Sequence, residues 1–269
     1  MDLLLAITWN ASPEIISLGP ITLRWYGLLF AAGFLIGLYI VKDMFKEENA
    51  PEPWLDKAFM HVVLGAVIGA RLGHVFFYDW DFYSQNLAEI PKIWRGGLAS
   101  HGGAIGIIIA LWIFSINVSK KSVLWILDKV VVPTALAGFF IRLGNLMNSE
   151  ILGRETDVSW AFIFVREDNI PRHPVQLYES VLYLLSFAVL YSLYKKTNAK
   201  QKQGFFFGLF LILIFGFRIW MEFFKESQGG FESSFGNLLS TGQLLSIPFV
   251  LIGLYFVLKP GGSKLVFKK

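Results

Sequence analysis

Apolar stretches of about 20 residues recur along the whole chain, and they limit its possible folds more than any other feature. A helix of that length can cross the hydrocarbon core of a bilayer. The candidate spans are residues 18–41, 57–78, 100–117, 123–143, 174–194, 204–224 and 240–258. We therefore predict an all-α polytopic membrane protein, a helical bundle of about seven transmembrane helices with a head region at its outer face.

The composition agrees with a chain that is solvated by lipid. Of the 269 residues, 55% are hydrophobic and 16% are charged, whereas an average soluble domain has about 25% charged residues. No internal repeat and no linker rich in Pro or Gly divides the sequence, so we expect a single integral membrane domain over residues 1–269. The first residues lack the positive region of a signal peptide, and no cleaved leader is expected.

The chain contains no cysteine. This excludes thiolate catalysis, cysteine-ligated zinc and disulfides within the chain, so any thiol in its chemistry must belong to a substrate. The four histidines, at positions 61, 74, 101 and 173, have no metal-ligand spacing on one helix, and no metal is expected. The net charge of +4 comes mainly from lysines in short loops, which orient a membrane protein, so nucleic acid is not expected as a partner.

Basic residues are distributed unequally between alternate loops. One set of loops carries thirteen of them: Lys42, Lys46, Lys57, Lys120, Lys121, Lys195, Lys196, Lys200, Lys202, Lys259, Lys264, Lys268 and Lys269. The other set carries six: Lys92, Arg95, Arg154, Arg166, Arg172 and Lys225. Because the excess of basic residues belongs in the cytoplasm, we expect the N-terminus outside and the C-terminus in the cytoplasm. The two long loops, residues 79–99 and 144–173, then lie on the outer face.

Several ionisable side chains fall within the predicted spans or at their outer ends. They are Arg71, Arg142, Glu179, Arg218 and Glu222. Charged groups in a bilayer are costly unless they are paired or hydrated, so they indicate function by default. Arg218 and Glu222 are four residues apart on one helical face. Two interpretations stay open: a structural ion pair, or an Arg218 that binds an anionic headgroup while Glu222 holds its guanidinium in position.

A second polar strip begins at Arg142. Arg142 and Asn145 share a helical face, Asn148 follows three residues later, and Glu150 comes next. Helix capping by Asn and Gly would explain the amides but neither the Arg nor the Glu, so this strip favours a functional site.

Two further segments carry histidine. His101 lies among glycines and opens a predicted span on the same side as Arg142, and a histidine suits general-base chemistry near neutral pH. A base and a headgroup ligand are equally open for it. His173 begins the segment His-Pro-Val-Gln-Leu-Tyr-Glu, which is more often architectural than catalytic.

Taken in order, these motifs resemble those of the bacterial prolipoprotein diacylglyceryl transferases. The matching segments are residues 19–20, 24–27, 69–73, 96–98, 101–103, 142–153, 173–179, 217–218, 222–224 and 242–248. Each piece alone is weak, whereas the ordered set over nearly the full chain is specific.

The resemblance implies transfer of the diacylglyceryl group of phosphatidylglycerol to the thiol of a lipobox cysteine in a preprolipoprotein signal peptide. This reaction releases glycerol 1-phosphate, is the first step of bacterial lipoprotein maturation, and takes place in the cytoplasmic (inner) membrane. Membrane lipids are the other expected partners, and no cofactor is expected. The resemblance also accounts for the absence of cysteine from the chain, because the reacting thiol would belong to the substrate.

By motif position, the resemblance assigns site residues of two kinds. The expected catalytic residues are His101, Arg142, Arg218 and Glu222, and the expected substrate-binding residues are Tyr26, Arg142, Asn145, Glu150, Gly153 and Arg218. In this hypothesis the guanidinium groups of Arg142 and Arg218 stabilise the phosphate oxyanion that leaves. His101 is a candidate base for the thiol, and thiolate formation assisted by arginine is the alternative.

The chain departs from the family pattern at four positions. Ile141 stands where the family usually has Gly, Leu146 where it has Phe, Ile214 where relatives carry Tyr, and Lys225 where Arg often follows Phe-Phe. These changes spare the predicted site residues, so they affect packing and any role of a tyrosine hydroxyl. A lipid or anion transporter is the second functional class, but no internal repeat supports it. A scaffold without catalysis, the third class, gains little from intramembrane charges.

Overall fold

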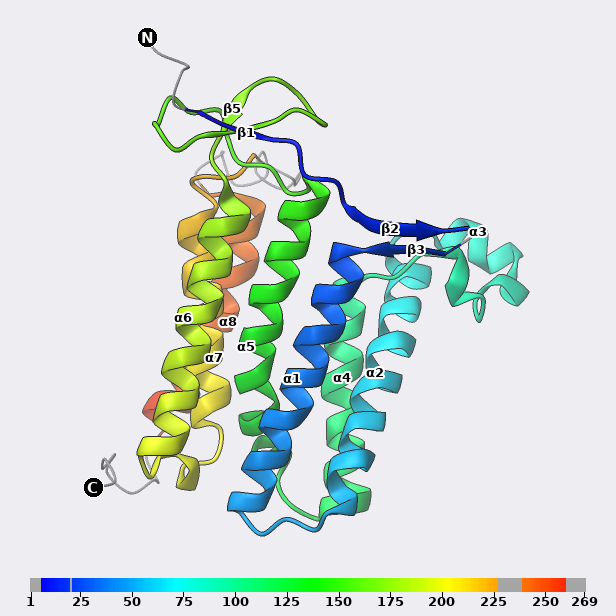
Figure 1. Ribbon diagram of the computed structural model, residues 1–269. Coiled ribbons are helices and arrows are strands. Elements are labelled where there is room, and N and C mark those ends of the chain that lie inside the picture. The colour runs from blue at the N-terminus through cyan, green and yellow to red at the C-terminus, as the bar shows by residue number, and fades with distance from the viewer. Residues whose placement is uncertain (1–5, 20, 227–238, 260–269) are drawn as a thin grey trace. The chain divides into compact units, whose positions relative to one another are not determined.

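The computed structural model describes residues 6–19, 21–226 and 239–259, and its helices follow the predicted spans (Figure 1). The long helices are α1 (Trp25–Glu47), α2 (Pro53–Phe77), α4 (Ser100–Phe114, continued by the π-helix η4, Ser115–Ser119), α5 (Val123–Asn148), α6 (Val175–Lys196), α7 (Phe205–Met221) and α8 (Thr241–Leu258). Within the described residues, six of these are long and apolar enough to cross a membrane, and α7 is a shorter apolar helix of 17 residues. The chain is a polytopic membrane protein, as predicted.

The chain forms two compact units. The first contains residues 1–40 and 130–269, and the second contains residues 41–129. Helices α1 and α5 each contribute residues to both units. The expectation of one domain over the whole chain stays a prediction.

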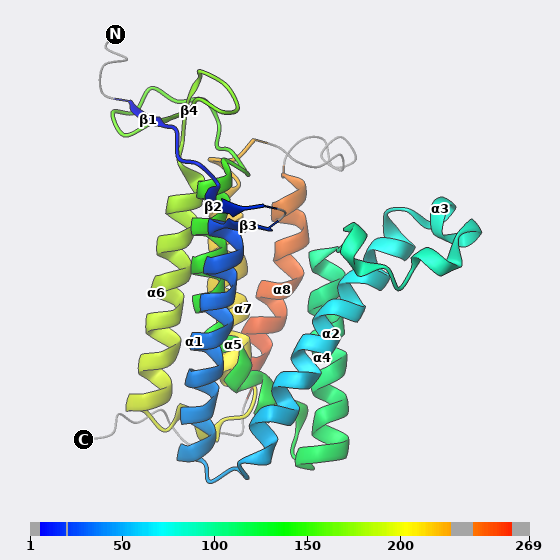
Figure 2. The ribbon, with the colours of Figure 1, turned by 45° about the vertical axis from the view of Figure 1, so that its right-hand side comes forward.

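Small residues bring the helices of the first unit close together. Helix α7 packs against α6 and α8, and the three run side by side in both ribbon views (Figures 1 and 2). A Cβ atom built on Gly253 of α8 would lie 2.6 Å from the carbonyl oxygen of Gly208 on α7. One built on Gly33 of α1 would lie 3.3 Å from the Cα atom of Ala137 on α5. Such small residues let helix backbones approach where lipid provides no hydrophobic driving force.

A three-stranded sheet forms the head of the first unit. Its order is β1 (Ile7–Trp9), β4 (Phe162–Phe164) and β5 (Pro171–Arg172), with β1 parallel and β5 antiparallel to β4. The indole N–H of Trp9 donates a hydrogen bond to the carbonyl of Leu146 at 3.0 Å, near the end of α5. Leu146, Phe162 and Phe164 are buried together below the sheet. The chain thus has the predicted head region, and it attaches directly to the end of α5.

The first predicted span begins too early. Residues 14–24 form an antiparallel hairpin of β2 (Glu14–Leu18) and β3 (Ile21–Arg24), and helix α1 begins only at Trp25. Gly19, with φ at +61°, lies between the strands in a left-handed conformation that side chains rarely adopt. An apolar stretch of this length does not separate strand from helix, so hydropathy alone extended the helix into the hairpin.

In the second unit, α2 and α4 meet along a stripe of glycines. Gly65, Gly69 and Gly73 of α2 face Gly102 and Gly106 of α4. A Cβ atom on Gly73 would lie 2.7 Å from the Cα atom of Gly102, and one on Gly69 would lie equally close to the Cα atom of Gly106. This stripe therefore serves helix packing.

The long loop of the second unit contains three short helices. They are α3 (Trp80–Gln85), η2 (Leu87–Glu89) and η3 (Ile93–Arg95), which follow α2 and precede α4. Figure 2 shows this segment beyond the end of α2. Two of its aromatic residues are well exposed, Trp94 at 76% and Trp80 at 47% of their full areas, whereas Tyr83 is buried. Rings of this kind suit the membrane interface.

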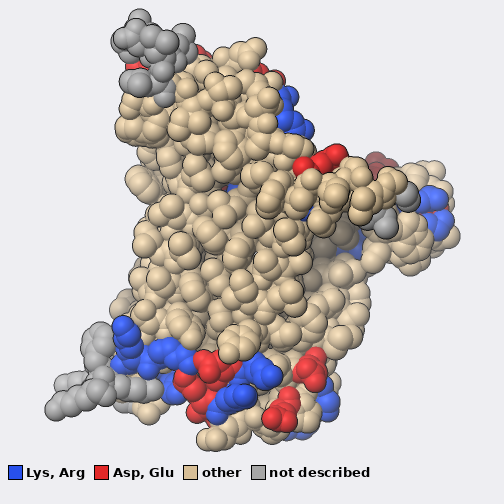
Figure 3. Space-filling model, in the orientation of Figure 1, with Lys and Arg blue, Asp and Glu red and all other residues tan. Residues whose placement is uncertain are grey.

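The outer surfaces of the long helices are apolar. Leu35 on α1, Val181 on α6 and Leu251 on α8 are among the exposed large hydrophobic residues. In the face that Figure 3 shows, charged side chains gather near the helix ends, and the helix surfaces between them are largely uncharged. Such surfaces are stable in contact with lipid, where the helical backbone satisfies its own polar groups.

Candidate active site

Three helices of the first unit enclose a pocket with charged and apolar walls. Its cavity volume is about 20 Å³, and the space between the lining atoms, including the part open to solvent, is about 300 Å³. The lining residues are Arg142 on α5, Glu179, Leu182 and Tyr183 on α6, and Ile214, Phe217, Arg218 and Met221 on α7. The pocket therefore brings together the two arginines that the sequence placed on separate spans.

Arg142 is held by two neighbours. Its Nε atom lies 2.9 Å from Oε2 of Glu179, and its Nη1 atom donates a hydrogen bond to Oδ1 of Asn145 at 3.2 Å. Asn145 follows one turn along α5, so the predicted shared face brings the two side chains into contact. The Arg142 side chain is 17% exposed and that of Glu179 is 5% exposed. A guanidinium so placed can bind an anion that enters the pocket.

Glu150 completes the polar strip beyond the end of α5. The helix ends at Asn148, and Ser149 and Ile151 both have φ at +57°, which turns the chain back. The Glu150 carboxylate accepts hydrogen bonds from the amide of Asn145 at 3.0 Å and from that of Asn148 at 2.9 Å. Because the Nδ2 group of Asn145 donates to Glu150, the Oδ1 atom at the other end of the amide is turned toward Arg142.

Arg218 lines the same pocket but has a different environment. Its Nε atom is buried, and no hydrogen-bond partner for it occurs among the described residues. A buried guanidinium nitrogen without a partner is costly, which suggests a ligand that accepts from it.

The interpretation that Glu222 pairs with Arg218 is not supported. Glu222 caps the C-terminus of α7, and its Oε2 atom accepts a hydrogen bond from the hydroxyl of Ser240 at 2.9 Å. Gly242, in the first turn of α8, lies so close that an added Cβ atom would collide with the Glu222 carboxylate. Helical spacing allowed an ion pair, but the end of α7 directs Glu222 toward the start of α8 instead.

Two other predicted residues of the first unit lie at close backbone contacts. Tyr26 in the first turn of α1 packs on Gly144 of α5, where a Cβ atom would lie 2.7 Å from its ring. Gly153 packs against the backbone of His173, and it forms a β-bridge with Lys225. Tyr26 thus contacts the Arg142 strip at Gly144, and Gly153 lies just after the strip in the sequence. Their predicted roles in substrate binding stay predictions.

His101 belongs to the second unit. It is the second residue of α4, and its side chain is exposed. The expectation that it opens a predicted span is confirmed, because α4 begins at Ser100. The helix start is fixed by a hydrogen bond from the Ala99 backbone N–H to the carbonyl of Ala70 on α2. Whether His101 acts as a base or as a headgroup ligand stays a prediction.

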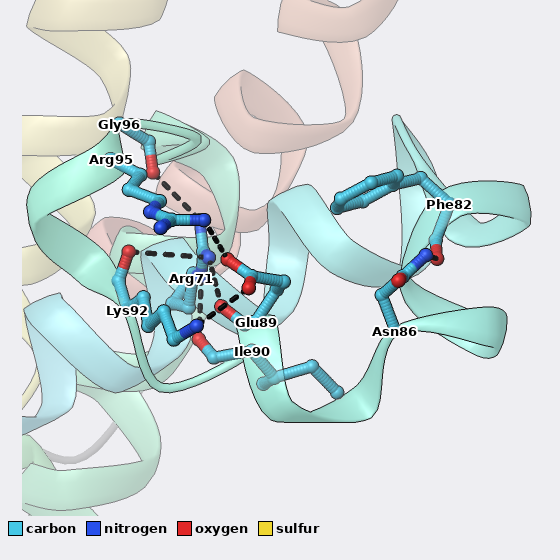
Figure 4. A network of polar contacts seen from close by, with 8 residues as sticks. All are labelled: Arg71, Phe82, Asn86, Glu89, Ile90, Lys92, Arg95 and Gly96. Carbon is cyan, nitrogen blue, oxygen red and sulfur yellow. Dashed lines mark hydrogen bonds and ion pairs between the residues drawn. The ribbon is translucent and has the colours of Figure 1, made fainter.

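Arg71, also in the second unit, has a structural environment. Its hydrogen bonds run from Nε to the carbonyl of Ile90 (2.7 Å), from Nη1 to those of Gly96 (2.6 Å) and Gly97 (3.2 Å), and from Nη2 to those of Glu89 (2.7 Å) and Lys92 (3.5 Å). Figure 4 shows the guanidinium surrounded by this loop. Its donors are used by backbone carbonyls, so the default interpretation of an intramembrane arginine as a functional group is not supported at Arg71.

Comparison with known proteins decides the family. Residues 13–259 match the family model described as prolipoprotein diacylglyceryl transferase. The chain belongs to this family. The resemblance found in the sequence motifs is thereby confirmed over most of the transferase chain.

Named relatives match the transferase over nearly their full lengths. A protein of Tolumonas auensis is 49% identical over 256 residues, which cover 95% of this chain and 98% of the relative. One of Chloroherpeton thalassium is 48% identical over 257 residues, covering 96% and 95%. One of Bacteroides fragilis is 44% identical over 277 residues, covering 98% and 99%. All three are named phosphatidylglycerol–prolipoprotein diacylglyceryl transferase.

Sequence reasoning gave no specific site role to two residues at or near the transferase pocket. Glu179 was placed in an architectural motif, but its carboxylate contacts Arg142 and also lies 2.6 Å from the ammonium of Lys225. Lys225 was noted only as a departure from the family pattern. The position of Glu179 in a predicted span was a usable signal, whereas nothing local in the sequence connects Lys225 with α6.

A metal site is not seen in the described part of the transferase. No group of three or more His, Asp or Glu side chains there could hold a metal ion.

Proposed function

We propose that the chain transfers the diacylglyceryl group of phosphatidylglycerol to the cysteine thiol of a prolipoprotein lipobox, with the phosphate held by Arg142 and Arg218. The observation that carries this proposal is the pocket between α5, α6 and α7, which two guanidinium groups line. The buried Nε atom of Arg218, which has no hydrogen-bond partner among the residues that the structure describes, is a donor that a phosphate oxygen can satisfy. The family and its named relatives supply the reaction.

The reaction is a displacement at carbon. The cysteine sulfur attacks the glycerol carbon that bears the phosphate, a C–S bond forms, and the C–O bond breaks. The bonding electrons stay on the phosphate oxygen, so glycerol 1-phosphate leaves with an additional negative charge. Positioned guanidinium donors act where this charge develops. The thiol proton must also be lost to a base, and the candidate from the sequence motifs is His101.

The pocket walls suit a lipid substrate. Ile214, Phe217 and Met221 of α7 form apolar wall beside Arg218. A phospholipid presents a phosphate next to acyl chains, so one ligand would satisfy both kinds of surface. Ile214 stands where relatives carry a tyrosine, and this pocket therefore has no hydroxyl at that position.

The test uses purified protein, phosphatidylglycerol vesicles and a synthetic lipobox peptide. The expected products are a peptide whose mass has increased by one diacylglyceryl group and an equal amount of glycerol phosphate. A peptide with serine in place of cysteine should give neither product. If the wild-type protein forms neither product but moves lipid between leaflets, the transporter interpretation replaces the transferase.

The roles of the arginines are tested by substitution. Arg142→Lys and Arg218→Lys should each lower turnover by about 100-fold, as loss of a positioned donor does. Arg24→Lys is the matched control, because Arg24 is 62% exposed and pairs with Glu14 at the surface. Near-normal turnover of a well-folded Arg142→Lys protein would exclude the phosphate-binding role.

We also propose the orientation that the loop charges predict, with the N-terminus outside and the C-terminus in the cytoplasm of a bacterial inner membrane. The chain has no cysteine, so single introduced cysteines report on one site each. Asp157→Cys in the head should react with a membrane-impermeant maleimide in intact spheroplasts. Asn198→Cys, between α6 and α7, should react only after lysis. The reverse pattern would contradict the orientation.

A further inference from the structure

Glu179 binds two cations with its two oxygens. Its Oε2 atom lies 2.9 Å from Nε of Arg142, and its Oε1 atom lies 2.6 Å from Nζ of Lys225. All three side chains are largely buried: Glu179 is 5% exposed, Lys225 10% and Arg142 17%. Arg142 comes from α5, Glu179 from α6 and Lys225 from the segment after α7. Glu179 therefore connects the pocket arginine with a distant part of the chain.

The contact between Glu179 and Arg142 uses one edge of the guanidinium. A carboxylate and a guanidinium often pair through two parallel N–H···O bonds. Here Oε2 lies against Nε, and this contact lacks the alignment of a hydrogen bond. Oε1 is directed to Lys225 instead. The Nη1 atom of Arg142 is then available to bind Asn145 rather than Glu179.

Lys225 is held in place by its own backbone. Gly153 and Lys225 form a β-bridge, and the Arg154 side chain donates from Nε to the Lys225 carbonyl at 2.7 Å. The Arg154 backbone N–H donates to the carbonyl of Phe224 at 2.8 Å. These contacts do not involve the Lys225 side chain, so the segment should keep its position when that side chain is changed.

We propose that Lys225 is a positioning residue which, by binding one oxygen of Glu179, keeps Glu179 from pairing with Arg142 at two points. The N–H groups of Arg142 that Asn145 does not use then stay available for the phosphate of the lipid. This inference rests on the proposed phosphate-binding role of Arg142. Without the ammonium, Oε1 loses its partner in a buried site, and the nearest compensation is rotation of the carboxylate onto the guanidinium. The neutralised Arg142 would then bind phosphate weakly.

The first test is the substitution Lys225→Met, which keeps an unbranched side chain and removes the charge. We expect the KM for phosphatidylglycerol to rise about tenfold, with a smaller decrease in kcat and an unchanged thermal midpoint. Lys225→Arg should restore a KM within about twofold of the wild-type value, because a guanidinium can also bind Oε1. Lys196→Met, at the exposed end of α6, is the matched control and should leave KM unchanged.

The second test is a double-mutant cycle with Glu179→Gln. If Lys225 acts through the Glu179 carboxylate, Lys225→Met should have no further effect on KM in the Glu179→Gln protein. Independent effects that multiply would overturn the proposal. So would a Lys225→Met protein with a lower thermal midpoint and a normal KM, which indicates a role in stability alone. Should Lys225→Met fail to fold, Lys225→Gln gives the same comparison with a shorter side chain.

These outcomes are separate from failure of the proposed function. A wild-type protein that produces no thioether would overturn the transferase proposal itself. An active wild-type protein whose KM does not respond to Lys225→Met would overturn only the role of Lys225. Native mass spectrometry of the delipidated proteins should show that Lys225→Met also binds phosphatidylglycerol about tenfold more weakly than the wild type.

Discussion

Asn145 donates a hydrogen bond from its Nδ2 atom to the carboxylate of Glu150 at 3.0 Å, and this bond sets the direction of the whole amide. The opposite end, Oδ1, then faces Nη1 of Arg142 at 3.2 Å. Asn145 is buried, so its amide has few alternative partners. A neutral side chain with one donor and one acceptor end thus connects a carboxylate with a guanidinium.

Asn145→Asp should therefore impair activity strongly. The substitution places a carboxylate oxygen against Glu150, and the loss of a hydrogen bond to a charged group costs about 1.5–3 kcal/mol. We expect kcat/KM to fall by at least about tenfold. Asn148→Asp is the control, because Asn148 also donates to Glu150 but has no hydrogen bond to Arg142. Equal losses in the two variants would show that Glu150, rather than the orientation of Asn145, limits activity.

Gly144→Ala should destabilise the first unit at the contact between α5 and α1. The added Cβ atom would lie 2.7 Å from the Tyr26 ring and 3.2 Å from its Cα atom, so the ring and the backbone must both move. Overpacking of this kind costs about 1–3 kcal/mol. Gly216→Ala on α7 is the matched control, since nothing lies within 4 Å of its Cβ position. Thermal unfolding in detergent should show a lower midpoint only for Gly144→Ala.

Arg71→Lys should loosen the loop between α2 and α4. One ammonium cannot reach all the carbonyls that the guanidinium binds, so several of these partly buried carbonyls lose their donor. We expect faster proteolytic cleavage within residues 86–97. Arg95→Lys serves as the control, because Arg95 is 61% exposed and pairs with Glu89 at the surface of the same loop. Identical cleavage rates for both variants would contradict the structural role of Arg71.

The head region should lose stability as the pH falls below about 6.5. Burial lowers the pKa of His173 below its ordinary value of 6.5. The unfolded chain then binds the proton more tightly than the folded one, so this contribution is complete above pH 6.5 and is lost as the pH falls from 6.5 through the lower folded-state pKa. His173 lies 3.2 Å from the hydroxyl of Tyr178, which itself accepts from the indole of Trp160.

Thermal midpoints measured from pH 8 to pH 5 check this expectation. The wild-type midpoint should decrease over the lower part of that range, and His173→Gln should flatten the decrease. His61→Gln is the control, because His61 is in the second unit and its Nδ1 atom contacts only the carbonyl of Lys57 in its own helix. A pH dependence unchanged by His173→Gln would exclude His173 as its source.

Local patterns in the sequence predicted the helices and the polar strip of α5 well. Hydropathy located the spans, because a helix that faces lipid must be apolar over its length. Arg142 and Asn145 are three residues apart, so helical geometry alone brings them into contact. The error at residues 18–24 arose because a β-hairpin with apolar residues has the same mean hydropathy as a helix end.

Contacts between residues that are distant in the sequence could not be predicted from local patterns. Glu222 and Arg218 had ideal spacing for an ion pair, yet the hydroxyl of Ser240 provides the partner of Glu222. The carbonyls that bind Arg71 lie 18 to 26 residues away, in the loop between α2 and α4. The parallel pairing of β1 with β4 also has no local signal. Such contacts depend on the tertiary fold rather than on helical or strand periodicity.

The glycine contact between α2 and α4 also has a mechanical consequence. Two helices separated by long side chains can slide, because each rotamer change moves them slightly. Here the backbones of Gly69, Gly73, Gly102 and Gly106 touch directly, with no side-chain layer that could yield. Helices α2 and α4 should therefore move together as one rigid unit. His101 precedes Gly102 in the first turn of α4, so its backbone should move little along the helix axis.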